Sequence, residues 1–323
     1  MHTMPTPRLS GLVISVALLS FAGAALAQGA HPGASREEQI RASKVVVVSG
    51  SADHMDQVLR RAEVNFVVVS PDELPTLPLN SSQVLMVNCR GEMSDAARDR
   101  VRRFVAAGGF LYTTDHAVAE LVQKIFPNTI AFNNTTTTEE IFPMQLRGAE
   151  SDRGLLKHLD GQGAQQWQLA GGGYLFKILD PKRVDVLMES KQVAQRYGSG
   201  ALAVRFRYND GVVIHVTGHF FTQPGQRPDV AAAGRAFEQL SQNVVTEKAA
   251  DQGRIDALYN AAPKREVTLQ ASPAAGAPAV PAASVTSQSL GVKSKVRVLE
   301  TQGGYVRVRD EQGNEGWADK AAF

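Results

Sequence analysis

Short apolar runs alternate with longer amphipathic segments through the middle of the chain, which is the pattern of an α/β protein. Four runs are continuous, rich in β-branched or aromatic residues and followed by turn residues, as buried parallel strands are. They are Val45 to Val48, Asn65 to Val69, Val84 to Val87 and Phe110 to Tyr112. Asp95 to Ala107 has helical periodicity, and Ser94 is placed to cap it. The alternation predicts a doubly wound, mostly parallel sheet with right-handed crossovers.

The following segments continue the domain. A helix is expected over Ala117 to Ile125, and the polar, threonine-rich Asn133 to Glu140 is expected to be a loop. Asn209-Asp210-Gly211 separates two apolar runs, Leu202 to Tyr208 and Val212 to Val216, and such a tripeptide predicts a hairpin. An amphipathic helix over Asp229 to Val245 then closes the domain.

The last part of the chain has a different character. Ala271 to Ala283 is rich in alanine and proline, which is typical of an extended linker or a long loop. Three short segments of alternating polarity follow, Lys295 to Glu300, Tyr305 to Asp310 and Glu315 to Asp319. They predict a small antiparallel barrel. We therefore expect an α/β domain over residues 43–262 and a small all-β domain over residues 263–323.

The N-terminus has the features of an export signal. Arg8 precedes the apolar run Gly11 to Ala25, and Ala25-Leu26-Ala27 has the small-residue pattern of a cleavage site. Residues 1–27 are predicted to be a signal peptide and residues 28–42 a spacer, which gives a periplasmic or secreted protein without a stable membrane span after cleavage. An uncleaved membrane anchor is the alternative.

Composition excludes some partners and one form of stabilisation. The 323 residues are 43% hydrophobic and 20% charged, with a net charge of +2 and no cluster of Lys and Arg, so no nucleic-acid partner is expected. Cys89 is the only cysteine, so the monomer has no internal disulfide and must depend on its core.

Polar residues follow the predicted strands at the ends where α/β sheets bind their ligands. They are Ser49 and Ser51, Asn88 and Cys89, Asp115 and His116, and His219. We expect the side chains to converge on one crevice. Asp115, His116 and His219 are candidates for metal ligands, since carboxylate and imidazole suit zinc. A hydrogen-bonded network in which Asp115 fixes an imidazole tautomer accounts for the same residues.

No complete catalytic set accompanies these residues. The segment Thr114-Asp115-His116 has no serine or cysteine at the turn where a nucleophile would stand. Cys89 follows a different strand, where we expect a packed structural thiol. The sequence identifies no cofactor.

The segments VVVVSG, VLMVNC, AAGGFLYTTDH and GVVIHVTGH together resemble the class I glutamine amidotransferase-like superfamily, which has a flavodoxin-like fold and includes ThuA-like proteins. The resemblance covers about Lys44 to Val245. It implies a catalytic histidine at His219 and a nucleophilic cysteine where this chain has Thr114 and Asp115. The missing nucleophile implies a pseudoenzyme.

The segment KVRVLETQGGYVRVRDEQGNEGWADKAAF resembles bacterial SH3 (SH3b) domains. The resemblance implies a first strand at Val267 to Ala271, with the Ala/Pro-rich stretch as its long first loop. It also implies a cell-wall peptide or envelope protein as partner, contacted by Tyr305 and Trp317. The alternative is that Trp317 belongs to the core of the module.

These expectations combine into two hypotheses. The first is an exported, non-catalytic binding or scaffolding protein of the cell envelope. The second is a periplasmic metal- or Asp/His-dependent hydrolase that uses Asp115, His116 and His219 as ligands or as acid and base.

Overall fold

The computed structural model describes residues 33–149, 152–159, 166–219 and 228–323, without the side chains of residues 228–234. The predicted signal peptide lies outside the described residues. Within the described ranges, no helix is both long enough and apolar enough to cross a membrane.

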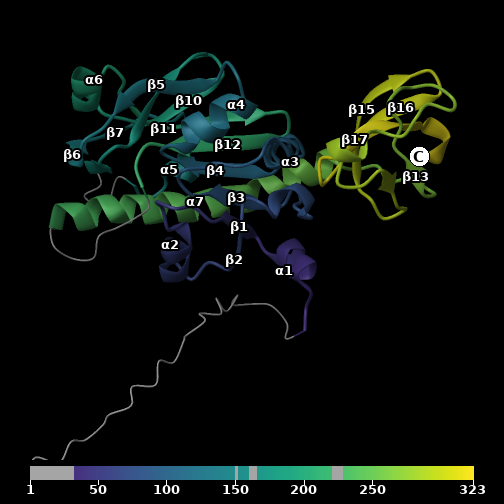
Figure 1. The fold of residues 1–323 in the computed structure, drawn as a ribbon, viewed down its shortest axis with the longest axis horizontal. Helices are drawn as coiled ribbons and strands as arrows, with labels where there is room; N and C mark the ends of the chain where they lie inside the picture. The colour runs from purple at the N-terminus through teal and green to yellow at the C-terminus, as the bar shows by residue number, and fades with distance from the viewer. Residues whose placement is uncertain (1–32, 150–151, 160–165, 220–227) are drawn as a thin grey trace, which may run out of the picture.

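A sheet of eight strands forms the centre of the α/β domain (Figure 1). Five adjacent strands are parallel: β2 (Phe66–Val69), β1 (Val45–Val48), β3 (Val84–Val87), β4 (Phe110–Thr114) and β12 (Gly211–Val216). Three antiparallel strands extend it: β11 (Ala201–Tyr208), β10 (Val184–Glu189) and β7 (Gln145–Leu146). The predicted mixed α/β fold with a mostly parallel sheet is confirmed. In open α/β sheets of this kind, ligands bind beyond the carboxyl ends of the parallel strands.

Both faces of the sheet are covered, because successive side chains of a strand point to opposite sides. Val45 and Val47 belong to one core cluster, with residues of α2 (Met55–Arg61) and α7 (Pro228–Leu258). Val46 and Val48 belong to the other cluster, with α3 (Asp95–Ala106) and the π-helical turn Val118–Val122, which leads into α4 (Gln123–Ile125). The continuous apolar strands of the sequence are therefore buried on both faces.

The segment Asn133 to Glu140 differs from the expected loop. Its first half belongs to β5 (Ile130–Thr136), which pairs with β9 (Tyr174–Ile178). β6 (Glu140–Pro143) pairs with β8 (Gln166–Leu169) in a second small sheet. The second half of β5 has polar, partly exposed side chains, so it lacks the apolar periodicity by which strands are recognised.

Part of the expected spacer is a helix of the domain. Ser35 and Glu38 form a capping box at the start of α1 (Arg36–Ala42), and Ile40 is fully buried in the core. The side-chain amide of Gln83 donates to the carbonyls of Ile40 at 2.6 Å and Ser43 at 2.8 Å. The short helices α5 (Arg153–Leu156) and α6 (Lys191–Tyr197) complete the domain.

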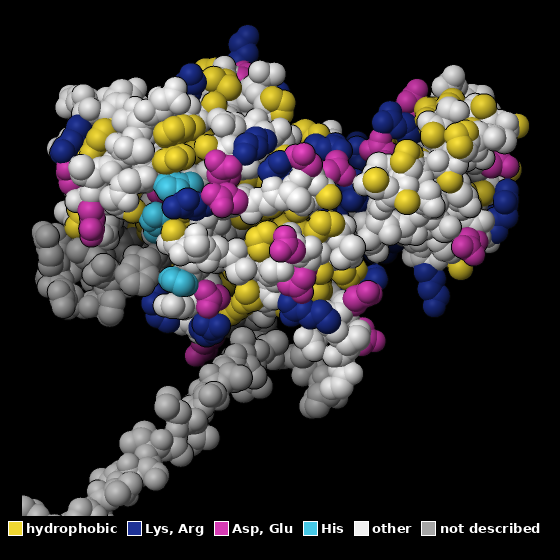
Figure 2. All heavy atoms as spheres, in the orientation of Figure 1, with side chains coloured by type: hydrophobic (Ala, Val, Ile, Leu, Met, Phe, Trp, Pro, Cys, Tyr) yellow, Lys and Arg dark blue, Asp and Glu magenta, His cyan; other side chains and the backbone are white. Residues whose placement is uncertain are grey.

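Residues 263–323, here called the β module, form a separate small lobe (Figure 2). They contain β13 (Val267–Thr268), β14 (Ser289–Leu290), β15 (Val296–Gln302), β16 (Tyr305–Asp310) and β17 (Glu315–Asp319). The first two strands pair with each other, as do the last three, and Gln270 bridges to Trp317 of β17. The Ala/Pro-rich stretch connects β13 to β14 within the β module, since Ala271 N donates to Pro278 O and Val280 N to Leu269 O. It is a loop of the β module and does not separate two domains.

Buried charged side chains connect the β module to the α/β domain. Asp210, in the turn between β11 and β12, is 3% exposed. Its carboxylate accepts hydrogen bonds from Arg297 and, at 3.4 Å, from Arg309, both of the β module. Tyr259, just after α7, donates to the same carboxylate at 3.3 Å. Arg309 also donates to the carbonyl of Ala106 at 3.0 Å.

Candidate functional site

The carboxyl ends of β1, β3, β4 and β12 meet in one place, and a glycine allows the first two to approach. A Cβ atom on Gly50 would lie 2.2 Å from the carbonyl oxygen of Cys89, so a larger residue does not fit there. Ala52 N donates to the same carbonyl at 3.2 Å. Ser49 and Ser51 are both exposed beside this contact.

Asp115 is the residue at the centre of this edge. It is fully buried and has a φ of 48°, which is unusual for a residue with a side chain and marks a sharp turn after β4. One carboxylate oxygen accepts from Tyr174 N at 2.8 Å, and the other accepts from Gly218 N at 3.2 Å. The carboxylate is therefore held by the backbone on both sides.

Two histidines flank this carboxylate. His116 Nε2 lies 3.4 Å from Asp115 Oδ1 and 2.9 Å from the carbonyl oxygen of Gly172. The His116 and His219 rings have centroids 6.3 Å apart. His219 Nε2 is buried and has no hydrogen-bond partner within the described part of the chain. Burial lowers the pKa of His219, and Asp115 opposes this effect while His116 adds to it.

Cys89 completes the group. Its thiol is fully buried beside the backbone of His116. Burial raises the pKa of Cys89 to about 12, and the nearby charges of Asp115 and Asp53 contribute to the increase. The thiol is therefore protonated at neutral pH. The ligand atoms of Cys89, Asp115 and His219 all lie within 4.8 Å of one another.

Asp53, just before α2, is a further residue of this edge that the strand-end pattern does not single out. The helix starts at Met55, and Asp53 lies before it, 1% exposed, at the same edge of the sheet. Its carboxylate accepts from Thr114 Oγ1 at 2.7 Å and from His54 N at 2.9 Å. Its position just after the Ser49-Gly50-Ser51 turn is the signal that could have identified it.

Asn88, expected as a ligand-binding residue, has a structural contact. Its side-chain oxygen accepts from Met55 N at 3.1 Å and so caps α2 from a neighbouring strand. His215 lies apart from the site, since it is fully buried within the sheet with Nδ1 2.9 Å from Thr113 Oγ1.

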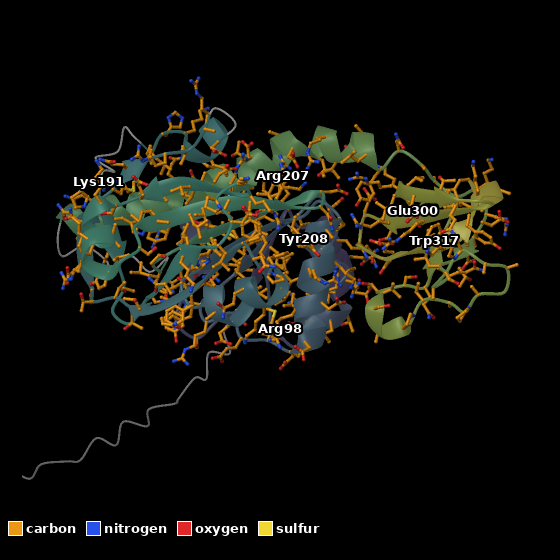
Figure 3. All side chains as sticks on the ribbon, turned by 90° about the horizontal axis from the view of Figure 1, so that it is seen from above. Arg98, Lys191, Arg207, Tyr208, Glu300 and Trp317 are labelled. Atoms are coloured by element: carbon orange, nitrogen blue, oxygen red, sulfur yellow. The ribbon has the colours of Figure 1, made fainter. Side chains whose placement is uncertain are left out.

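Tyr305 and Trp317 lie on the β module, away from the crevice. Figure 3 labels Trp317 at one end of the molecule and Lys191 of α6 at the other. Both aromatic side chains are half-buried, and neither belongs to the apolar clusters of the β module. Trp317 pairs across the strands with Arg307, which is exposed.

Comparison with known proteins finds distant structural neighbours only. No protein-family model and no curated protein sequence matches the chain. A ThuA-like protein from Parabacteroides merdae is 11% identical, with a TM-score of 0.42 over 63% of this chain and 89% of that one. A ThuA-like protein from Bacteroides uniformis is 10% identical, with a TM-score of 0.40 over 69% and 94%. A cytoplasmic protein from Salmonella typhimurium is 10% identical, with a TM-score of 0.41 over 63% and 98%.

Proposed function

We propose that the protein is a non-catalytic binding or scaffolding protein of the cell envelope. The observation that carries the proposal is the state of Asp115, which occupies the sharp turn after β4. In the superfamily that the sequence resembles, this turn presents a nucleophile. Here the side chain is fully buried and both carboxylate oxygens accept backbone hydrogen bonds, so it is not presented to a substrate.

Cys89 does not replace the missing nucleophile. A cysteine attacks as its thiolate, and reactive cysteines lie in partly exposed, electropositive surroundings. Cys89 is instead buried beside two carboxylates, with its pKa raised to about 12. The thiol therefore lacks both the charge and the access that covalent catalysis requires.

The β module supplies the binding part of this proposal. Tyr305 and Trp317 are half-buried aromatic residues outside its apolar core, which is a common property of recognition surfaces. On the face drawn in Figure 2, acidic and basic side chains are interspersed, which favours a peptide or protein partner over a polyanion. We propose that an SH3-like β module holds an exported protein at cell-wall peptides or an envelope protein.

Hydrolysis assays on the full chain test the absence of catalysis. We expect the wild type and Cys89→Ser to show the same background rate on glutamine, activated esters and cell-wall peptides. His158→Asn, at an exposed histidine outside the crevice, is the matched control. Turnover by the wild type that disappears in a folded Cys89→Ser protein would contradict the proposal.

Cosedimentation with isolated peptidoglycan tests the binding role of the β module. Trp317→Ala should reduce the fraction of the protein that sediments with peptidoglycan, whereas Val298→Ala, at an exposed valine of β15, should not.

A metal- or Asp/His-dependent hydrolase is the second candidate. The grouping of Cys89, Asp115 and His219 favours it, because three side-chain ligands with one open position are typical of catalytic zinc sites. The same assays with added Zn²⁺ distinguish the two functions. Turnover that depends on zinc and is lost in His219→Ala would favour the hydrolase.

A further inference from the structure

We infer that Cys89, Asp115 and His219 form a binding site for a zinc-like divalent cation at the carboxyl edge of the sheet. The three residues follow β3, β4 and β12, and their ligand atoms lie within 4.8 Å of one another. The inference concerns the binding of a metal ion and not catalysis. It goes beyond the proposed function and holds whether or not the domain is catalytic.

The spacing is close to what coordination requires. Zinc binds sulfur at about 2.3 Å and nitrogen or oxygen at about 2.0–2.2 Å, which places tetrahedral ligand atoms roughly 3.5 Å apart. A separation of up to 4.8 Å therefore closes by about 1 Å on binding. Rotation of the His219 ring provides part of this movement, since its Nε2 has no hydrogen bond to break among the described residues.

The hydrogen bonds around the three residues resemble those that orient the ligands in known metal sites. Each Asp115 oxygen accepts one backbone hydrogen bond, from Tyr174 or from Gly218, and retains another lone pair. Such contacts fix the direction of a ligating carboxylate. His116 stands beside the group and is held by the carbonyl of Gly172, so it can support Asp115 without being one of the three ligands.

The charge of the site also favours a cation. Asp53 and Asp115 both act on Cys89, so this buried edge brings two carboxylates close to one thiol. A divalent cation would balance these charges and displace the thiol proton, because a coordinating thiol is deprotonated on binding. Sulfur and imidazole ligands select zinc and related ions over magnesium or calcium, which prefer oxygen alone.

The test is titration of the chelator-treated full chain with Zn²⁺ and with Co²⁺. We expect one zinc ion per chain by calorimetry, and a thiolate-to-cobalt charge-transfer band in the absorption spectrum. Cys89 is the only cysteine, so this band reports on this site alone. Cys89→Ser should abolish the band. His219→Gln and Asp115→Asn should each weaken binding by at least the roughly 10–100-fold that loss of an outer-shell partner costs.

Controls separate metal binding from folding. His158→Asn removes an exposed histidine elsewhere and should bind zinc as the wild type does. Thermal melting monitored by circular dichroism should show that each variant is folded, and zinc should raise the melting temperature of the wild type but not of His219→Gln. Absence of the cobalt band in the wild type would overturn the inference. A band that persists unchanged in folded His219→Gln would overturn it too, since the thiol would then bind without its partners. These readouts do not measure turnover, so they can fail while the proposed function holds.

Discussion

His215 is a buried histidine whose surroundings keep it neutral. It lies within β12, fully buried, and burial lowers its pKa to about 3. The unfolded chain exposes the same imidazole, which then titrates near pH 6.5. Between about pH 3 and pH 6.5, the His215 side chain therefore binds a proton in the unfolded state but not in the folded state. The contribution of His215 to stability is therefore complete above about pH 6.5 and is lost as the pH falls toward 3.

This difference predicts a slope in the free energy of unfolding. Between about pH 4 and pH 6, His215 should make the wild type gain about 1.4 kcal/mol per pH unit relative to a variant without the imidazole. His215→Gln can keep the hydrogen bond to Thr113 and should remove that part of the slope. Urea unfolding at several pH values measures it. His158→Gln, at a residue exposed in the folded protein, should keep the wild-type slope, and equal slopes for His215→Gln and the wild type would contradict the argument.

At the scale of residues, the location of the site residues was easier to predict than the role of each one. The rule that parallel strands end at one edge places Cys89, Asp115, His116 and His219 together, and the structure does bring them together. The same rule cannot tell a ligand from a helix cap, and the side-chain oxygen of Asn88 accepts a hydrogen bond from Met55 N at the start of α2. The rule does not single out the buried Asp53, because this residue lies in the connection between the end of β1 and the start of α2 and does not directly follow the strand.

At the scale of elements, two glycines test how α7 packs on the sheet. Gly108, in the turn before β4, has a φ of 114°, and a Cβ there would lie 2.6 Å from Cδ1 of Ile255 in α7. Gly253 is also in α7, and its Cβ position meets open space. The same substitution therefore has opposite expected effects at two positions that report on one helix.

Gly108→Ala should destabilise the protein by about 1–3 kcal/mol, because alanine is strained at this φ and its methyl group displaces Ile255. Gly253→Ala should stabilise it by up to about 1 kcal/mol, since alanine is a much better helix former than glycine. Denaturant unfolding of both variants measures the two effects. A loss of stability in Gly253→Ala would mean that α7 does not continue through this residue.

Elements with strong apolar periodicity were predictable, and those without it were not. The four parallel strands and the hairpin of β11 and β12 follow from continuous apolar runs and the Asn-Asp-Gly turn. The strand β5 was missed because its threonine and asparagine side chains are partly exposed. α7 continues to Leu258, beyond the predicted end at Val245, in a stretch that is mostly polar. Its position there depends on tertiary contacts such as Ile255 with Gly108.

At the scale of the whole molecule, the β module and the α/β domain share buried polar contacts. Arg100 of α3 is fully buried and donates to the carbonyls of Leu77, Leu79 and, in the β module, Gln312. Burial lowers the pKa of Arg100 to about 9. Together with the contacts of Asp210 with Arg297 and Arg309, this contact makes the position of the β module part of the fold.

Asp210→Asn should test whether this interface stabilises the whole chain. The asparagine keeps the shape of the side chain but removes the charge that faces Arg297 and the buried Arg309. Removing one partner of a fully buried ion pair costs roughly 3–5 kcal/mol. The cost here should lie below that range, because Arg309 keeps its ion pair with Glu315 and the Arg297 side chain is 32% exposed. Urea unfolding followed by circular dichroism should show a decrease of about 1–3 kcal/mol in the free energy of unfolding. The matched control is Asp319→Asn, whose ion pair with Arg265 is more than half exposed on both sides and should contribute little. If the two substitutions had equally small effects, the buried charges would not fasten the β module, and it would behave as a separately folding unit on a flexible connection.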